Sequence, residues 1–301
     1  MITSPDKLLF PSDGITKAQV AEYYETVAPR LIDHIAGRPL TLQRFPKGIE
    51  AKGFMQKNAP NHLPASMERV DVPKVDGGVT RYLVVRNADD IELLVNLNTI
   101  TFHIWMARLP NLEKIDRLVF DLDPVAGDIS GARTATLLVK ERLAGLGLRS
   151  SVMTTGSKGY HVVVGISPTD GDTTGPFAWG IARLLAADHP AVVTDEFRVA
   201  KRERRVFVDW LRNRPGSTGV APWSLRPLAG APVAMPIDWE ELAAADPQTW
   251  TLATAVERSQ GPDPVAQHCR QPQDIAQACQ SVADQLTERG IELAPFDRFR
   301  S

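Results

Sequence analysis

The chain has 301 residues, of which 43% are hydrophobic and 23% are charged, and its formal net charge is −2. No apolar run approaches the roughly 20 residues that a membrane-spanning helix needs, and the N-terminus lacks the charged and apolar segments of a signal peptide. This composition therefore excludes membrane and signal-bearing classes, and it favours an ordinary soluble protein of one large or two modest domains.

Cysteine usage supports the same class of protein. Only Cys269 and Cys279 occur, their spacing fits no common zinc pattern, and two thiols do not make a disulfide framework. We expect free thiols in a reducing cytoplasm, and no membrane partner.

The first half of the chain predicts one long helix and several strands. Thr16 and Gln19 have capping-box spacing and open a helix that runs toward His34, with Pro29 expected to kink or interrupt it. Strands are predicted over 41–45 and 81–86, whereas the stretch from Ile91 to Trp105 mixes helical and strand patterns.

The second half alternates strands and helices irregularly, which predicts an α/β or α+β fold with a mixed sheet. A strand ends at Asp123, and a glycine turn joins two further β-rich runs. The proline-rich segment 215–236 is expected to be an ordered loop, and the chain after Pro236 to be mostly helical. The predicted helices cover about 131–146 and 176–187, and the further strands cover 150–155, 160–166 and 205–210.

Three carboxylates stand out against these strands. Asp121 and Asp123 share one face of the strand in RLVFDLDP, and like charges so close repel unless a cation lies between them. Asp209 ends the β-branched run RVFVDW; if the two strands are neighbours, three carboxylates meet at one sheet edge. We would expect these carboxylates to bind Mg²⁺ or Mn²⁺, with two such ions about 4 Å apart. The alternative is that Asp121 and Asp123 cap a loop while Asp209 pairs with an arginine.

Two further segments carry groups that suit phosphate. TTGSKGYH places Ser157, Lys158 and His161 around a glycine turn, although it lacks the spacing of a Walker A loop and a lone histidine there is more often a core or edge residue. APWSLRPLAGAPVAMP adds Ser224 and Arg226, whose guanidinium can fork onto phosphate or simply cover a neighbouring tryptophan.

Charge is unevenly distributed. Residues 198–214 hold seven Arg or Lys against two acids, whereas residues 236–301 hold 11 acids against five Arg. The basic run can attract a polyanion such as nucleic acid, or it can be a solvated charged face beside an acidic tail.

Taken together, these segments resemble the polymerase domain of bacterial ligase D, in the archaeo-eukaryotic primase superfamily. The resemblance runs in order from about residue 6 to 243. The resemblance implies a primase-like catalytic core with an RRM-like sheet. It implies a primase-polymerase domain over 1–245 (an N-terminal α/β module, 1–115, and a metal and nucleotide module, 116–245) and a C-terminal helical cover over 246–301. We find no ligase lysine motif or nuclease histidine cluster, so we expect a stand-alone member. The segments are DKLLFPSDGITKAQVAEYYETVAP, GRPLTLQRFPKGI, GFMQKNAP, NLNTITFHIW, LVFDLDP, TTGSKGYHVVV, RVFVDWLRN and APWSLRPLAGAPV.

The resemblance also implies site residues. The metal-binding catalytic carboxylates are Asp121, Asp123 and Asp209, and Lys7 and Lys17 grip a 5′-phosphate. Three positions depart from the family pattern and put base positioning and template preference in doubt: Met55 for a second aromatic, Thr101 for Glu and Arg212 for Gln. The implied nucleotide-binding residues are His103, Ser157, Lys158, His161, Arg202, Ser224, Arg226 and Phe54, with Lys57 and Asn213 at the rim.

The implied activity is template-directed nucleotide addition by two-metal phosphoryl transfer. The resemblance implies Mn²⁺ or Mg²⁺ as cofactor, NTP or dNTP as substrate with a preference for ribonucleotides, and DNA with short gaps, overhangs or 5′-phosphorylated ends. It also implies a role in end joining or gap filling at the nucleoid, with Ku and a separate ligase as partners. Two alternatives remain: a haloacid dehalogenase-like phosphatase with Asp121 as nucleophile, and a non-catalytic DNA-end-binding protein.

Overall fold

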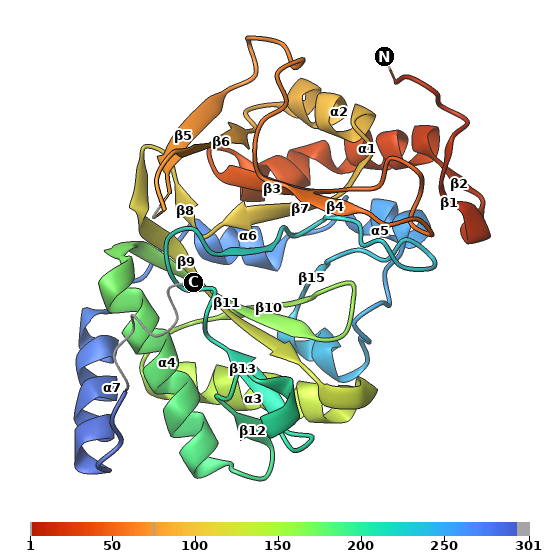
Figure 1. The fold of residues 1–301 in the computed structure, drawn as a ribbon. Helices are drawn as coiled ribbons and strands as arrows, with labels where there is room; N and C mark the ends of the chain where they lie inside the picture. The colour runs from red at the N-terminus through yellow and green to blue at the C-terminus, as the bar shows by residue number, and fades with distance from the viewer. Residues whose placement is uncertain (1, 75, 294–301) are drawn as a thin grey trace.

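The computed structural model describes residues 2–74 and 76–293, which form a mixed α/β fold around two main sheets (Figure 1). The N-terminal sheet has the strand order β14-β7-β3-β6-β5, with β4 paired to β3, and all its pairs are antiparallel. A separate two-stranded sheet joins β1 to β2. The strand bounds are β1 Leu8–Phe10, β2 Ile15–Thr16, β3 Pro39–Arg44, β4 Phe54–Gln56, β5 Arg69–Pro73, β6 Val79–Val84, β7 Thr99–Trp105 and β14 Thr218–Val220.

The second sheet has the order β12-β13-β9-β11-β10-β15, and β8 pairs with β9. Its pairs are antiparallel except β12 with β13, so the sheet is mixed, as the sequence predicts. The two central strands are β9 and β11, both longer than the sequence pattern predicts. The bounds are β8 Ala107–Arg108, β9 Asn111–Asp123, β10 Ser151–Thr154, β11 Tyr160–Asp170, β12 Val193–Thr194, β13 Val206–Asp209 and β15 Pro236–Ile237.

Helices cover both sheets. α3 and α4 pack on β9 and β11, α7 packs on α4, and α6 lies between the sheets against β10, β11 and β15 (Figure 1). Of the described helices, none combines the length and the apolar character that crossing a bilayer requires. The helices are α1 Lys17–Ile35, α2 Ala88–Asn96, α3 Ile129–Gly145, α4 Gly171–Asp188, α5 Leu252–Arg258, α6 Pro264–Cys269 and α7 Ala276–Glu288, with 3₁₀ turns at Pro11–Asp13, Val125–Gly127, Val199–Lys201 and Trp239–Ala243.

Helix α1 begins where the sequence predicts, because a capping box closes its first turn. The side-chain hydroxyl of Thr16 accepts from the backbone N–H of Gln19, and the side-chain oxygen of Gln19 accepts from the backbone N–H of Thr16. The expected interruption at Pro29 is wrong, since the helix continues to Ile35. Burial of the apolar face that includes Val20 and Leu31 offsets the roughly 3 kcal/mol that an internal proline costs.

The segment between β14 and β15 joins the two sheets. Trp223 within it is fully buried and adopts a left-handed backbone conformation with φ of 67°. Its indole nitrogen donates to Asp263, and its carbonyl accepts from the hydroxyl of Tyr23. The segment is therefore an ordered crossing, as expected, and it leads from β14 in the N-terminal sheet to β15 in the second sheet. The proposed boundaries after 115 and 245 stay predictions.

Candidate functional site

The three predicted carboxylates lie on neighbouring strands. In the β13–β9 ladder Asp209 is the register partner of Asp121, and Phe207 is the partner of Asp123. On the other side of β9, His161 is the register partner of Asp121. The side chains of Asp121, Asp123 and Asp209 therefore share one face near one end of the central strands, which is the adjacency that the sequence expectation required.

Burial makes this cluster electrostatically demanding. Desolvation together with the Asp121 charge raises the pKa of Asp123 to about 6, and desolvation raises the pKa of Asp209. Asp121 is 7% exposed, yet its pKa is lowered, because His161 and Arg212 outweigh the effect of burial. One Asp121 oxygen, Oδ1, has no hydrogen-bond partner and lies 3.4 Å from His161 Nε2.

Arg212 supplies the positive charge between two of these carboxylates. Its Nη2 lies 3.0 Å from Asp121 Oδ2 and 3.4 Å from Asp209 Oδ2, while Nη1 donates to the carbonyl of Thr218. The alternative that Asp209 pairs with an arginine is borne out by this contact. The contact of Arg212 with Asp121 was missed, because the sequence marks Arg212 only as a departure from a family pattern. The sequence signal available for this contact was the position of Arg212, three residues beyond Asp209 at the end of the predicted strand.

Asn213 fixes the turn that presents Arg212. Its side-chain oxygen accepts from Val119 N at 2.7 Å, and its amide nitrogen donates to the carbonyls of Val119 and Trp210. Because Asn213 is 1% exposed, its predicted place at the rim of the site is wrong. It satisfies buried backbone groups that the end of the β13–β9 ladder leaves unpaired.

The donor set suits a hard divalent cation. Asp121, Asp123 and Asp209 offer carboxylate oxygens, the ligands that Mg²⁺ and Mn²⁺ prefer, and the buried Oδ1 of Asp121 has no hydrogen-bond partner. Across residues 2–74 and 76–293, however, no three acidic, histidine or cysteine side chains converge closely enough to ligate one ion. Since the Arg212 guanidinium lies between Asp121 and Asp209, an ion bound by both would require it to move.

The glycine turn beside the carboxylates needs its glycines. Gly156 has a φ of +64°, and a β-carbon there would lie 2.7 Å from atoms of Arg226 and Val233. At Gly159 a β-carbon would lie 1.9 Å from the carbonyl oxygen of Leu122, between the two strand aspartates. The turn can therefore approach β9 only with glycine at these positions.

A cavity of about 120 Å³ brings several predicted nucleotide-binding residues to two of the carboxylates. Burial, with the nearby charges of Arg226 and Arg212, lowers the pKa of His103 to about 3, so its imidazole is neutral at neutral pH. Lys158 is exposed on the turn. The lining residues are His103, Asp121, Asp123, Thr155, Ser157, His161, Arg212, Gly219, Val220 and Arg226.

Arg202 and Ser224 lie outside this lining. The Arg202 guanidinium stacks 4.4 Å from the Phe207 ring centre and donates to the carbonyls of Glu196 and Phe197. Ser224 is fully buried and its hydroxyl accepts from Phe102 N, so its place at the nucleotide stays a prediction that this bonding does not support.

Phe54, expected at the incoming nucleotide, and Lys57, expected at the rim of the site, do not line this cavity. Phe54 and Met55 are 46% and 48% exposed on strand β4, with the Arg44 guanidinium 5.3 Å from the Phe54 ring centre, and Lys57 is exposed beyond them. The exposed position of Phe54 leaves its ring face accessible to a base.

The two lysines expected at a 5′-phosphate are held by the protein. Lys17 is 2% exposed and its ammonium donates to Thr3 and, at 2.8 and 2.7 Å, to the carbonyl and side chain of Asn96. Lys7 donates to the carbonyl of Pro46. Their phosphate role stays a prediction, and for Lys17 it requires these bonds to open.

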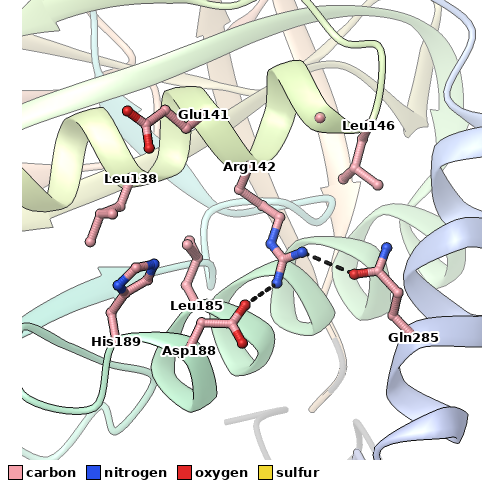
Figure 2. A pocket seen from close by; sticks show the side chains of 9 residues that line it. Leu138, Glu141, Arg142, Leu146, Leu185, Asp188, His189 and Gln285 are labelled. Atoms are coloured by element: carbon pink, nitrogen blue, oxygen red, sulfur yellow. Dashed lines mark hydrogen bonds and ion pairs between the residues drawn. The ribbon is translucent and has the colours of Figure 1, made fainter.

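A second hollow lies between α3, α4 and α7, away from the carboxylates (Figure 2). Arg142 points into it and donates to Asp188 and Gln285, at 2.8 and 2.9 Å. Because the charge of Arg142 is paired with that of Asp188, the side chains that line this hollow give no evidence of a ligand site.

The fold and the carboxylate site define a primase-polymerase, a class of nucleotidyltransferases. A family model described as "LigD, primase-polymerase domain" matches residues 16–265, and the chain belongs to this family. The family assignment sets aside the phosphatase interpretation.

Relatives and a solved structure support the same family assignment. The chain is 30% identical to a multifunctional non-homologous end joining protein LigD of Mycolicibacterium smegmatis, over 98% of this chain and 36% of that one. It is 34% identical to a protein of the same description from Pseudomonas aeruginosa, over 92% and 34%. It thus spans about a third of the length of these relatives. The polymerase domain of Mycobacterium tuberculosis ligase D in complex with DNA superimposes with a TM-score of 0.84 at 29% identity, covering 90% of this chain and 98% of that one.

Proposed function

We propose that the protein adds nucleotides to the 3′ end of a DNA primer at short gaps or broken ends, with a preference for ribonucleotides. The main support for this proposal is that Asp121, Asp123 and Asp209 lie on adjacent strands, beside a glycine turn that carries Ser157 and Lys158. Family membership and the DNA complex of the similar ligase D domain support it.

In this proposal the three carboxylates hold Mg²⁺ or Mn²⁺. Such ions would activate the primer hydroxyl and stabilise the leaving pyrophosphate. The protein's own groups position the triphosphate: Lys158 and Arg226 contribute charge, and Ser157 donates a hydrogen bond. The neutral His103 can donate one hydrogen bond without adding charge beside Arg226.

On the DNA side, the exposed ring of Phe54 provides a stacking surface, and Lys7 and Lys17 supply 5′-phosphate contacts that position the duplex without reading sequence. A role in end joining is supported by the names of the relatives. Action at the bacterial nucleoid, with Ku and a separate ligase as partners, is part of the proposal and rests on the family resemblance alone.

Primer extension on gapped DNA tests the proposal directly. Wild-type protein with Mn²⁺ should extend the primer, and should use ribonucleotides better than deoxynucleotides. Asp121→Ala and Asp209→Ala should abolish extension while DNA binding stays measurable. Extension at the wild-type rate by either variant would remove the carboxylates from the chemistry, and binding without extension by the wild type would favour the end-binding alternative.

The 5′-phosphate contacts need their own comparison. The wild type should fill a gap faster when the downstream strand carries a 5′-phosphate, and Lys7→Ala should lose that advantage. Lys17→Ala should also lose stability, because its ammonium holds Thr3 and Asn96. Lys114→Ala is a matched control, because Lys114 is 40% exposed and lies outside the predicted site. An unchanged phosphate advantage in Lys7→Ala would refute the assignment.

A further inference from the structure

A pocket at the back of the fold gathers four arginines from four elements. Arg38 follows α1, Arg108 ends β8, Arg117 lies in β9 and Arg270 follows α6. With Ile32, Asp33, Ala36, Ala266 and Cys269 they line a cavity of about 390 Å³. Arg117 precedes Asp121 by four strand residues, roughly 13 Å at the usual rise per residue, so this pocket is separate from the carboxylate site.

Local sequence explains why the pocket exists. Gly165 is the register partner of Arg117, and a β-carbon on Gly165 would lie 2.8 Å from the backbone of Cys269. The missing side chain lets the end of α6 approach the sheet and close the pocket. His268 on α6 accepts from Gly165 N at 3.1 Å, and burial, with Arg149 and Arg117, lowers its pKa to about 4, so it adds no charge at neutral pH.

The arginines are only partly neutralised. Asp116 pairs with Arg38 at 2.7 Å and with Arg108 at 3.6 Å, and Asp33 pairs with Arg270 at 2.7 Å. Two carboxylates therefore face four guanidinium groups, and about two positive charges remain.

Arg117 is the arginine without a counter-ion. It is 3% exposed, its Nε has no hydrogen-bond partner, and no carboxylate in the described chain forms an ion pair with it. An isolated buried charge is strongly unfavourable. The contrast with Arg142, which is fully paired in the hollow of Figure 2, shows that this chain supplies partners to buried arginines elsewhere.

We propose that this pocket binds a phosphate group, with Arg117 as its principal contact. A phosphate carries close to two negative charges at neutral pH, which matches the residual charge of the pocket. Guanidinium groups recognise its oxygens through paired hydrogen bonds. The phosphate can belong to a small molecule such as inorganic phosphate or pyrophosphate, or to the end of a nucleic acid strand, and the volume admits either.

The test is a titration of the metal-free full chain, in EDTA at constant ionic strength, with inorganic phosphate, pyrophosphate and a short 5′-phosphorylated DNA strand in separate arms. Binding is measured calorimetrically and by melting temperature. At least one arm should saturate. Arg117→Met and Arg108→Gln should each weaken that binding at least tenfold.

Two controls keep the outcome decisive. Arg81→Met removes an exposed arginine that lines neither pocket and should leave the binding unchanged; loss of binding there, with Arg117→Met unaffected, would overturn the proposal. Arg117→Met should melt no lower than the wild type without ligand, because it removes an uncompensated charge, so a folding defect cannot mimic the result. Failure of every arm to saturate also overturns the proposal. Saturation by phosphate and pyrophosphate that Arg117→Met weakens assigns a small-molecule source, and saturation by DNA alone that Arg117→Met weakens assigns a strand end. Saturation that Arg117→Met leaves unchanged belongs to the site of the proposed function and overturns this proposal.

Discussion

Arg212 acts as an internal counter-ion for two of the three site carboxylates, and replacing it tests that role. Arg212→Gln keeps a polar side chain but shortens it, and removes the charge 3.0 Å from Asp121 and 3.4 Å from Asp209. Without metal, the two carboxylates are then left facing each other in a buried site. With a divalent ion present, the ion no longer has to displace a guanidinium.

The magnitude follows from the burial of the pair. Removing one partner of a buried ion pair costs about 3 to 5 kcal/mol, but the Arg212 side chain is 35% exposed and the acids can take up protons. We therefore expect about 2 to 3 kcal/mol, which for a chain of this length lowers the melting temperature by roughly 3 to 5 °C. If the variant binds Mn²⁺ tenfold more tightly than the wild type, that binding would stabilise its folded state by about 1.4 kcal/mol more.

The assay is thermal unfolding in EDTA and across a Mn²⁺ titration, without nucleotide. Arg212→Gln should melt lower than the wild type in EDTA and should gain more stability from Mn²⁺. Arg81→Gln is the matched control, because Arg81 pairs with Asp71 at 2.7 Å with both side chains about half exposed, and such pairs contribute less than about 1 kcal/mol. An Arg212→Gln protein that melts like the wild type in EDTA, with no larger response to Mn²⁺, would refute the counter-ion role.

Two further predictions concern the glycine turn and the buried acid at Trp223. Gly159→Ala should force the turn away from Leu122, lower the free energy of unfolding by about 1 to 3 kcal/mol and slow primer extension roughly a hundredfold. Gly145→Ala is the control, because a β-carbon there meets open space at the end of α3, and it should change neither stability nor extension. A stable and active Gly159→Ala protein would contradict the close approach of the turn to β9. Although burial opposes it, bonding to His34 and Trp223 lowers the pKa of Asp263 to about 2, against an ordinary 3.8. This depressed pKa contributes on the order of 2 kcal/mol above pH 4, which is lost as the pH falls toward 2. Denaturant unfolding between pH 2 and 5 should show this slope in the wild type and not in Asp263→Asn; equal slopes would exclude Asp263 as its source.

Local patterns account for much of what the sequence predicts correctly. The capping pair at Thr16 sets the start of α1, and strand alternation places Asp121 and Asp123 on one face. The β-branched run before Asp209 predicts a strand, and its conditional pairing with β9 is confirmed by the register. Each of these depends on residues within a few positions of one another.

Polar residues whose partners lie far along the chain were not predictable in this way. Asn213 satisfies Val119, 94 residues away, and Ser224 satisfies Phe102, 122 residues away. Lys17 is buried because Asn96 provides acceptors 79 residues later. A polar side chain in a functional motif can serve either a ligand or an unpaired backbone group, and only the tertiary structure decides which.

The return of residues 218–220 to the N-terminal sheet makes the two halves of the enzyme a single folding unit. A protein ending before β14 would leave the edge of β7 bare, and an unpaired internal edge invites strand addition between molecules. Chimeras with relatives should therefore transfer β14, residues 218–220, together with the first 115 residues. Divided at 115 alone, neither piece carries a complete sheet.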